Sequence, residues 1–131
     1  MDKDILKRLK GAGLLSEQVS DLGFVGTGSY ALNKIISGDF NKGIPIGMIT
    51  QFHGEASTGK TIFGTHILKE AQAKGYWTVM VDSENAYSRE FGTHLGIDME
   101  EIIYTNPETL EDCFQVIESI ILNIRESDKD T

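Results

Sequence analysis

The chain has 131 residues, of which 40% are hydrophobic, a formal net charge of −8 and one cysteine, Cys113. This length fits a single domain, and one cysteine excludes an internal disulfide framework and a multi-cysteine zinc site. Nucleic-acid binding depends on clustered Lys and Arg, so the negative charge excludes a chain that wraps nucleic acid over its whole surface. The absence of a long apolar run or a signal-peptide pattern predicts a soluble cytoplasmic protein with no membrane segment.

Residues 1–24 are interpreted as an N-terminal helical segment. Basic side chains between positions 3 and 10 surround a small apolar face made by Ile5, Leu6 and Leu9, and glycines at positions 11 and 13 end the pattern. We expect this apolar face to dock on protein, within the chain or on a neighbouring subunit, in preference to DNA or a membrane.

Helices and strands are predicted to alternate along the rest of the chain. Helices are expected from Ser29 to Gly38, from Lys60 to about Lys74, over residues 88–95 and from Leu110 onward. Short β-prone segments lie at residues 48–53, 76–81 and 102–105. This order favours an α/β fold, a parallel sheet with flanking helices and right-handed crossovers. Cys113 lies on the apolar stripe of the last helix and is predicted to be a core residue.

A glycine-rich motif lies between the first of these strands and the following helix. Gly54, Glu55, Ala56, Ser57, Thr58, Gly59, Lys60 and Thr61 satisfy the P-loop pattern G-x-x-x-x-G-K-[ST] in full. The backbone N–H groups of such a loop wrap the α- and β-phosphates of a nucleotide. Lys60 is expected to reach the β- and γ-phosphates, and the Thr61 hydroxyl to bind the Mg²⁺ that bridges them.

A second candidate site follows the strand at residues 76–81. Asp82 and Glu84 come at its carboxyl end, where ligands bind in open α/β sheets. In one interpretation Asp82 orients a Mg²⁺ ion; in another Glu84 orients the attacking water. A third is that both side chains merely cap the next turn.

Several motifs, taken together, resemble the RecA family of ATP-dependent DNA recombinases. They are Val-Gly-Thr-Gly-Ser at 25–29, Gly-Ile-Pro-Ile-Gly at 43–47, the P-loop at 54–61, Asp-Ser-Glu-Asn-Ala at 82–86, Leu-Gly-Ile-Asp at 95–98 and Thr-Asn-Pro-Glu-Thr at 105–109. The resemblance implies a P-loop NTPase fold in which residues 25–131 form part of a RecA-like ATPase core. It also implies that the N-terminal segment packs on an adjacent subunit of a filament.

The same resemblance implies roles for individual residues, with ATP and Mg²⁺ as cofactors. Glu84 would be the catalytic carboxylate that activates water, with Lys60 beside the γ-phosphate and Asp82 secondary. Phe91 falls where the family places an aromatic side chain against adenine, although its position in the helix at 88–95 also fits a core residue. Ser88 departs from the acid that the family has there, which leaves the base selectivity open.

The resemblance also predicts what lies outside this sequence. In the family, a second acidic strand and the loops that bind single-stranded DNA follow the helix that begins at Leu110, so the core looks truncated. The leading interpretation is the ATP-binding part of a recombinase of bacterial or phage type that forms homo-oligomeric filaments on single-stranded DNA for recombination and repair. The alternatives are a non-catalytic nucleotide-binding or filament-capping remnant and another ATPase of this superfold, such as a helicase.

Overall fold

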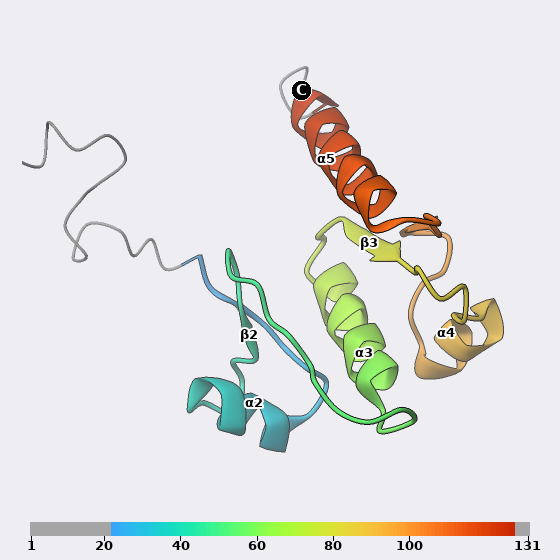
Figure 1. Ribbon diagram of the computed structural model, residues 1–131. Helices are drawn as coiled ribbons and strands as arrows, with labels where there is room; N and C mark the ends of the chain where they lie inside the picture. Colours follow the sequence, from blue (N-terminus) through green and yellow to red (C-terminus); the bar gives the residue numbers. More distant parts are fainter. Residues whose placement is uncertain (1–21, 128–131) are drawn as a thin grey trace, which may run out of the picture.

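The computed structural model describes residues 22–127, so the prediction of a helix near the N-terminus lies outside the described residues. The elements follow the order β1 (Phe24–Val25), α2 (Tyr30–Ser37), β2 (Ile44–Pro45), α3 (Lys60–Ala73), β3 (Thr78–Val81), α4 (Arg89–Leu95), β4 (Ile102–Thr105) and α5 (Leu110–Ser127) (Figure 1). The chain is therefore a mixed α/β protein, as the alternation of patterns predicted.

The predicted helices form, and their ends are set by local capping. Ser29 accepts a hydrogen bond from the backbone N–H of Leu32 at the start of α2, and the left-handed Gly38 ends that helix. Ser88 caps α4 in the same way, and the Thr109 hydroxyl accepts from the N–H of Asp112 at the start of α5. Short polar side chains satisfy N–H groups that have no partner within a helix, so these boundaries were readable from sequence.

The strands agree with prediction only in part. β3 and β4 pair in parallel, with Thr78 opposite Ile102 and Val81 opposite Thr105. β1 and β2 form a separate antiparallel pair. The prediction of a strand at residues 48–53 was wrong: that segment has no regular structure, and Ile49 is fully exposed. A strand is held by hydrogen bonds to a neighbour, and the described residues provide none for this segment.

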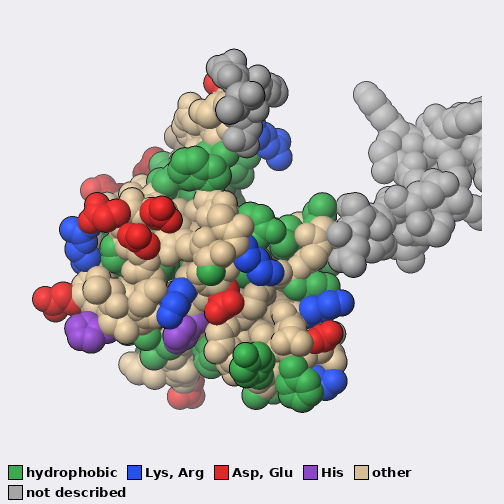
Figure 2. Space-filling view, turned by 180° about the vertical axis from the view of Figure 1, so that it is seen from behind, with side chains coloured by type: hydrophobic (Ala, Val, Ile, Leu, Met, Phe, Trp, Pro, Cys, Tyr) green, Lys and Arg blue, Asp and Glu red, His purple; other side chains and the backbone are tan. Residues whose placement is uncertain are grey.

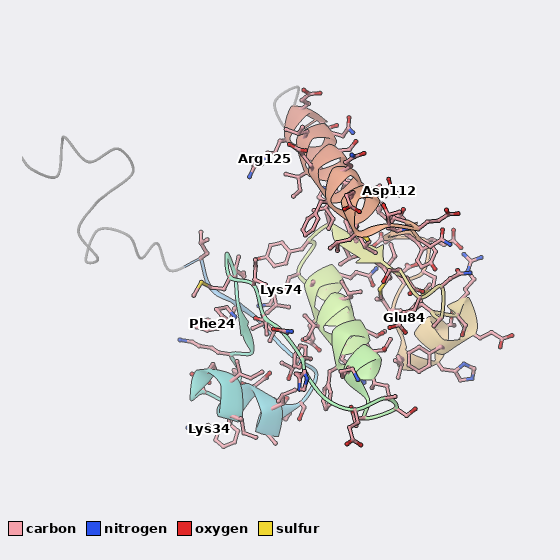
Figure 3. The ribbon with its side chains drawn as sticks, in the orientation of Figure 1. Phe24, Lys34, Lys74, Glu84, Asp112 and Arg125 are labelled. Carbon is pink, nitrogen blue, oxygen red and sulfur yellow. The ribbon has the colours of Figure 1, made fainter. Side chains whose placement is uncertain are left out.

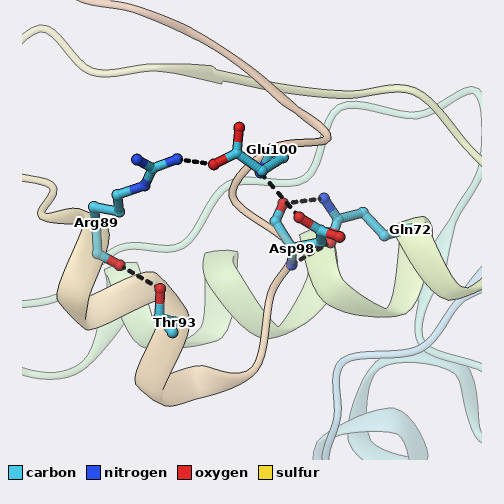
Figure 4. Close-up of polar contacts among 5 residues, drawn as sticks. All are labelled: Gln72, Arg89, Thr93, Asp98 and Glu100. Atoms are coloured by element: carbon cyan, nitrogen blue, oxygen red, sulfur yellow. Dashed lines mark hydrogen bonds and ion pairs between the residues drawn. The ribbon is translucent and has the colours of Figure 1, made fainter.

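Helix α3 is the centre of the described structure and contacts β1, β3 and α4 (Figure 1). Its Gln72 fixes the loop before β4, because the side-chain amide donates to the Asp98 carbonyl at 2.8 Å and accepts from the Asp98 N–H at 3.0 Å (Figure 4). Lys69 donates to the Leu95 carbonyl at 3.1 Å and so satisfies the carboxyl end of α4. These side chains couple α3 to the loop that carries the chain from α4 into β4.

The buried interior of the described residues is small and largely polar. Ile97 is the one buried hydrophobic residue among residues 22–127. Four polar residues of the same range are buried as well, namely Thr27, Asn33, Thr65 and Thr78. The apolar residues of α2 are mostly exposed, with Ile35 at 80% exposure. The buried position belongs instead to Asn33, whose Oδ1 accepts from the N–H and hydroxyl of Thr27 and whose Nδ2 donates to the Phe40 carbonyl.

Helix α5 projects from the rest of the structure and has no buried residue (Figure 1). Its apolar stripe is open to solvent, as the exposed Leu110, Phe114 and Ile121 show. The prediction that Cys113 is a core residue was therefore wrong, since its thiol is only half-buried. The apolar residues of α5 recur at helical spacing, but no described element covers them. Figure 2 shows apolar side chains in patches on the opposite face of the molecule, including the base of the part that projects.

None of the helices in the described part of the chain is both long and apolar enough to cross a membrane.

Candidate functional site

The glycine loop, residues 54–61, folds around the side chain of Lys60. The Lys60 ammonium donates to the carbonyls of Gly54 at 2.9 Å and Glu55 at 2.6 Å, and the Thr58 hydroxyl donates to the Glu55 carbonyl at 2.8 Å. A lysine placed this way holds a positive charge inside the loop. The same charge would attract an anion bound over the loop. The ammonium would then donate its hydrogen bonds to that anion in place of the two carbonyls.

The loop leads directly into the first turn of α3. Gly59 has the left-handed φ of +92° and no side chain that could cap the helix, and Ser57 is also left-handed, with φ +62°. The first backbone N–H groups of a helix lack partners within the helix and carry partial positive charge. With no side-chain cap at Gly59, the start of α3 presents these groups to a ligand, which is the arrangement that favours phosphate.

A cavity of about 920 Å³ joins the glycine loop to the end of β3. The predicted site residues that line it are Ala56, Ser57, Lys60, Thr61, Asp82, Glu84 and Phe91. Gly54, Glu55, Thr58 and Gly59 belong to the loop but do not line the cavity. Figure 3 labels Glu84 on the segment between β3 and α4, in the region between helices α3 and α4. Residues more than twenty positions apart thus meet at one site.

Asp82 is the most constrained of these side chains. Its Oδ2 accepts from the Tyr87 N–H at 2.8 Å and from the Tyr104 hydroxyl at 3.1 Å, and its Oδ1 accepts from the Glu84 N–H at 3.2 Å. The backbone donor at Tyr87 is the main reason that the pKa of Asp82 is lowered, with partial burial opposing it and Tyr104 assisting. This geometry is that of a turn cap, one of the roles considered from sequence.

Glu84 differs from Asp82 in having its carboxylate exposed and without a hydrogen bond or ion pair to the described residues. Only its backbone N–H is held, by Asp82. A carboxylate that faces the cavity and is not used by the fold is available to accept a proton or orient a water molecule.

Phe91 is half-buried on α4 and lines the cavity beside Tyr87, with the rings edge-to-face and their centroids 5.7 Å apart. Both earlier interpretations of Phe91 have a basis in this position, since the ring packs within the protein and borders the cavity. Tyr87 also joins α3, because its hydroxyl accepts from the Thr65 hydroxyl at 3.2 Å.

Two residues of the site were missed by the sequence analysis. Tyr87 follows the acidic segment and Tyr104 lies on β4, and both contact Asp82. The only signal in the sequence was a polar hydroxyl on each aromatic ring close to a strand end; the pairing of β3 with β4 is what brings Tyr104 next to Asp82.

The bonds to Asp82 predict how folding depends on pH. A pKa lowered by folding means that Asp82 contributes stability above the ordinary aspartate pKa of about 3.9, and that this contribution is lost as the pH falls through its lower folded pKa. We expect Asp82→Asn to reduce stability at pH 7 and to have a much smaller effect at pH 3. Urea unfolding followed by circular dichroism at both pH values measures this; an equal effect at both would contradict it.

The fold and the site define an α/β protein in which a glycine loop opens the central helix beside the carboxyl end of a parallel strand. Sequence comparison matches residues 6–125 to the family described as the RecA N-terminal domain. The chain belongs to this family.

Individual relatives agree with the family match. Protein RecA of Chlorobium chlorochromatii is 32% identical over 110 residues, which cover 84% of this chain and 29% of that protein. Protein RecA of Ureaplasma parvum serovar 3 is 30% identical over 117 residues, or 88% of this chain and 34% of the relative. Protein RecA of Brucella canis is 31% identical over 106 residues, which cover 81% of this chain and 28% of that protein. The chain therefore spans about a third of the length of these relatives.

Proposed function

We propose that this chain is the ATP-binding part of an ATP-dependent DNA recombinase with a P-loop NTPase core. The observation that carries the proposal is the single cavity shared by Lys60 and Thr61 of the glycine loop and by Glu84. Phosphate chemistry needs a positive loop for the nucleotide and a carboxylate within reach of the attacking water, and this cavity is lined by both.

Each residue has a role in this proposal. The N–H groups of residues 54–61 hold the phosphates, Lys60 neutralises the γ-phosphate, and the Thr61 hydroxyl binds Mg²⁺. Glu84 activates the attacking water, and Phe91 borders the base. Asp82 acts on the metal indirectly at most, because both of its oxygens accept hydrogen bonds from the turn. These donors suit ATP·Mg²⁺: the loop offers N–H groups and an ammonium, and Thr61 a hard oxygen.

The proposal for the intact protein follows from the relatives named Protein RecA. It would act in the cytoplasm as a homo-oligomeric filament on single-stranded DNA, with hydrolysis coupled to recombination and repair. The DNA contacts would lie in segments beyond the matched third.

A second function is favoured by the small interior and the exposed stripe of α5. Apolar surface on this scale is typical of a part that completes its fold against another protein segment. A non-catalytic nucleotide-binding or filament-capping role would then replace hydrolysis.

The rates of ATP hydrolysis by the unchanged chain and by Glu84→Gln distinguish the catalytic role from the non-catalytic one. We expect Glu84→Gln to bind ATP·Mg²⁺ with an affinity within about threefold of the unchanged chain and to lose at least ~100-fold in hydrolysis rate, because the amide cannot accept the proton. Calorimetric titration and phosphate release measure the two quantities. Binding without hydrolysis in the unchanged chain favours the non-catalytic role, and equal loss of binding in the variant would make Glu84 structural.

A further inference from the structure

The segment that carries Glu84 is tied to β4 at Asp82. The Asp82 N–H donates to the Thr105 carbonyl at 2.9 Å, which continues the pairing of β3 with β4 by one bond. The Tyr104 hydroxyl, next to Thr105 on β4, donates to the Asp82 carboxylate at 3.1 Å. Asp82 is therefore attached to β4 through both its backbone and its side chain.

From Asp82 the same carboxylate organises the loop that follows. Its two oxygens accept from the N–H groups of Glu84 and Tyr87, so it fixes the loop at its middle and at its end. Between them Asn85 takes a left-handed conformation, with φ +51°, and its N–H donates to the Asp82 carbonyl at 3.4 Å. Side-chain oxygens that accept from nearby backbone N–H groups set the shape of such turns.

Glu84 itself does nothing to fix this shape. Its carboxylate makes no hydrogen bond or ion pair with the described residues, yet Glu84 lines the same cavity as Lys60 and Thr61. The direction of Glu84 is therefore set by the Asp82 carboxylate, and the rotamer of that carboxylate is restricted by the Tyr104 hydroxyl.

We propose that Tyr104 is a positioning residue, whose hydroxyl holds the Asp82 carboxylate so that the 82–87 loop directs Glu84 into the glycine-loop cavity. This inference rests on the proposed function, since it assigns a purpose to the direction of Glu84. Tyr104 does not itself line the cavity. Its hydroxyl reaches the loop at the Asp82 carboxylate, with a longer contact of 3.5 Å to the Asn85 side-chain oxygen.

The tyrosine hydroxyl is the part of the side chain that matters. Tyr104→Phe keeps the ring and removes one donor, while the Tyr87 N–H still holds Asp82 Oδ2. The loop should therefore loosen without unfolding. Tyr30→Phe is the matched control, because Tyr30 is 72% exposed on α2 and its hydroxyl is not bonded to Asp82.

The test measures solvent exchange of the Glu84 and Tyr87 amides by NMR in the full chain, together with ATP·Mg²⁺ affinity and single-turnover hydrolysis. We expect Tyr104→Phe to speed exchange at both amides about fivefold and to lower the hydrolysis rate at saturating ATP by a similar factor. Affinity should stay within twofold, and Tyr30→Phe should change none of these.

Asp82→Asn provides the decisive comparison. Because Asp82 is the nearer of the two loop partners of the Tyr104 hydroxyl, adding Tyr104→Phe to Asp82→Asn should change amide exchange much less than Tyr104→Phe does alone. An additive effect in the double variant, or unchanged amide exchange in Tyr104→Phe, would overturn the inference. The exchange measurement needs no nucleotide, so a chain that fails to bind or hydrolyse ATP would refute the proposed function while the exchange data still decide the role of Tyr104.

Discussion

Replacing Lys60 with alanine is expected to weaken ATP·Mg²⁺ binding by roughly 100-fold. In the structure the Lys60 ammonium lies inside the glycine loop, bonded to the carbonyls of Gly54 and Glu55. A bound triphosphate would replace these neutral partners with charged ones, and each hydrogen bond between charged groups contributes about 1.5–3 kcal/mol. Since about 1.4 kcal/mol corresponds to tenfold in affinity, one or two such bonds account for the expected loss.

Titration calorimetry with ATP·Mg²⁺ checks this value, and Lys34→Ala is the matched control. Like Lys60, Lys34 is a helical lysine that donates to a backbone carbonyl, but it lies on α2 and bonds to Gly38, away from the cavity (Figure 3). Its removal should leave affinity within twofold. Similar affinities for Lys60→Ala and the unchanged chain would mean that the glycine loop is not the phosphate site.

Features that depend on neighbouring residues were predictable from the sequence. Ser29 and Ser88 mark the starts of α2 and α4, and Gly38 and Gly96 mark their ends, because capping is settled within one helical turn. β4 forms over the residues predicted for it. Residues of the glycine loop and of the acidic segment after β3 line one cavity, as expected for a segment at the carboxyl end of a strand, where ligands bind in open α/β sheets.

Features that depend on distant partners were not predictable. The segment at 48–53 has the composition of a strand, yet a strand exists only where another strand pairs with it. Asn33 displaces Ile35 from the buried face of α2 because it satisfies both the N–H and the hydroxyl of Thr27. Hydrophobic periodicity counts apolar residues and does not register a polar side chain that finds its partners across a loop.

The site shows the same division. Thr61 and Glu84 were assigned to it from local motifs. Tyr104 was not, because its contact with Asp82 follows from the register in which β3 and β4 pair. Register is a property of two segments, so one strand read alone does not reveal it.

The largest effect on stability is expected for Gly43→Ala. Gly43 precedes β2 and is packed so closely that an added Cβ would lie 2.4 Å from the Val25 carbonyl oxygen, 2.8 Å from Asn33 Oδ1 and 2.9 Å from the Thr27 N–H nitrogen. Two of these atoms belong to the backbone, and the third is the buried acceptor that satisfies Thr27. Relief of the clash must therefore break the Thr27–Asn33 hydrogen bonds or move β1 away from β2.

Overpacking costs about 1–3 kcal/mol, and a buried polar group left without its partner costs a similar amount. We expect Gly43→Ala to lower the free energy of unfolding by about 3 kcal/mol, measured by urea denaturation with circular dichroism. Gly64→Ala is the matched control, because Gly64 lies within α3 with no atom within 4 Å of an added Cβ. Alanine is better than glycine inside a helix by about 1 kcal/mol, so this variant should be more stable. Changes of opposite sign in the free energy of unfolding for these two Gly→Ala variants would show that packing around Thr27 and Asn33, and not glycine content, holds β1 against β2. Destabilisation by both variants to the same extent would reject that explanation.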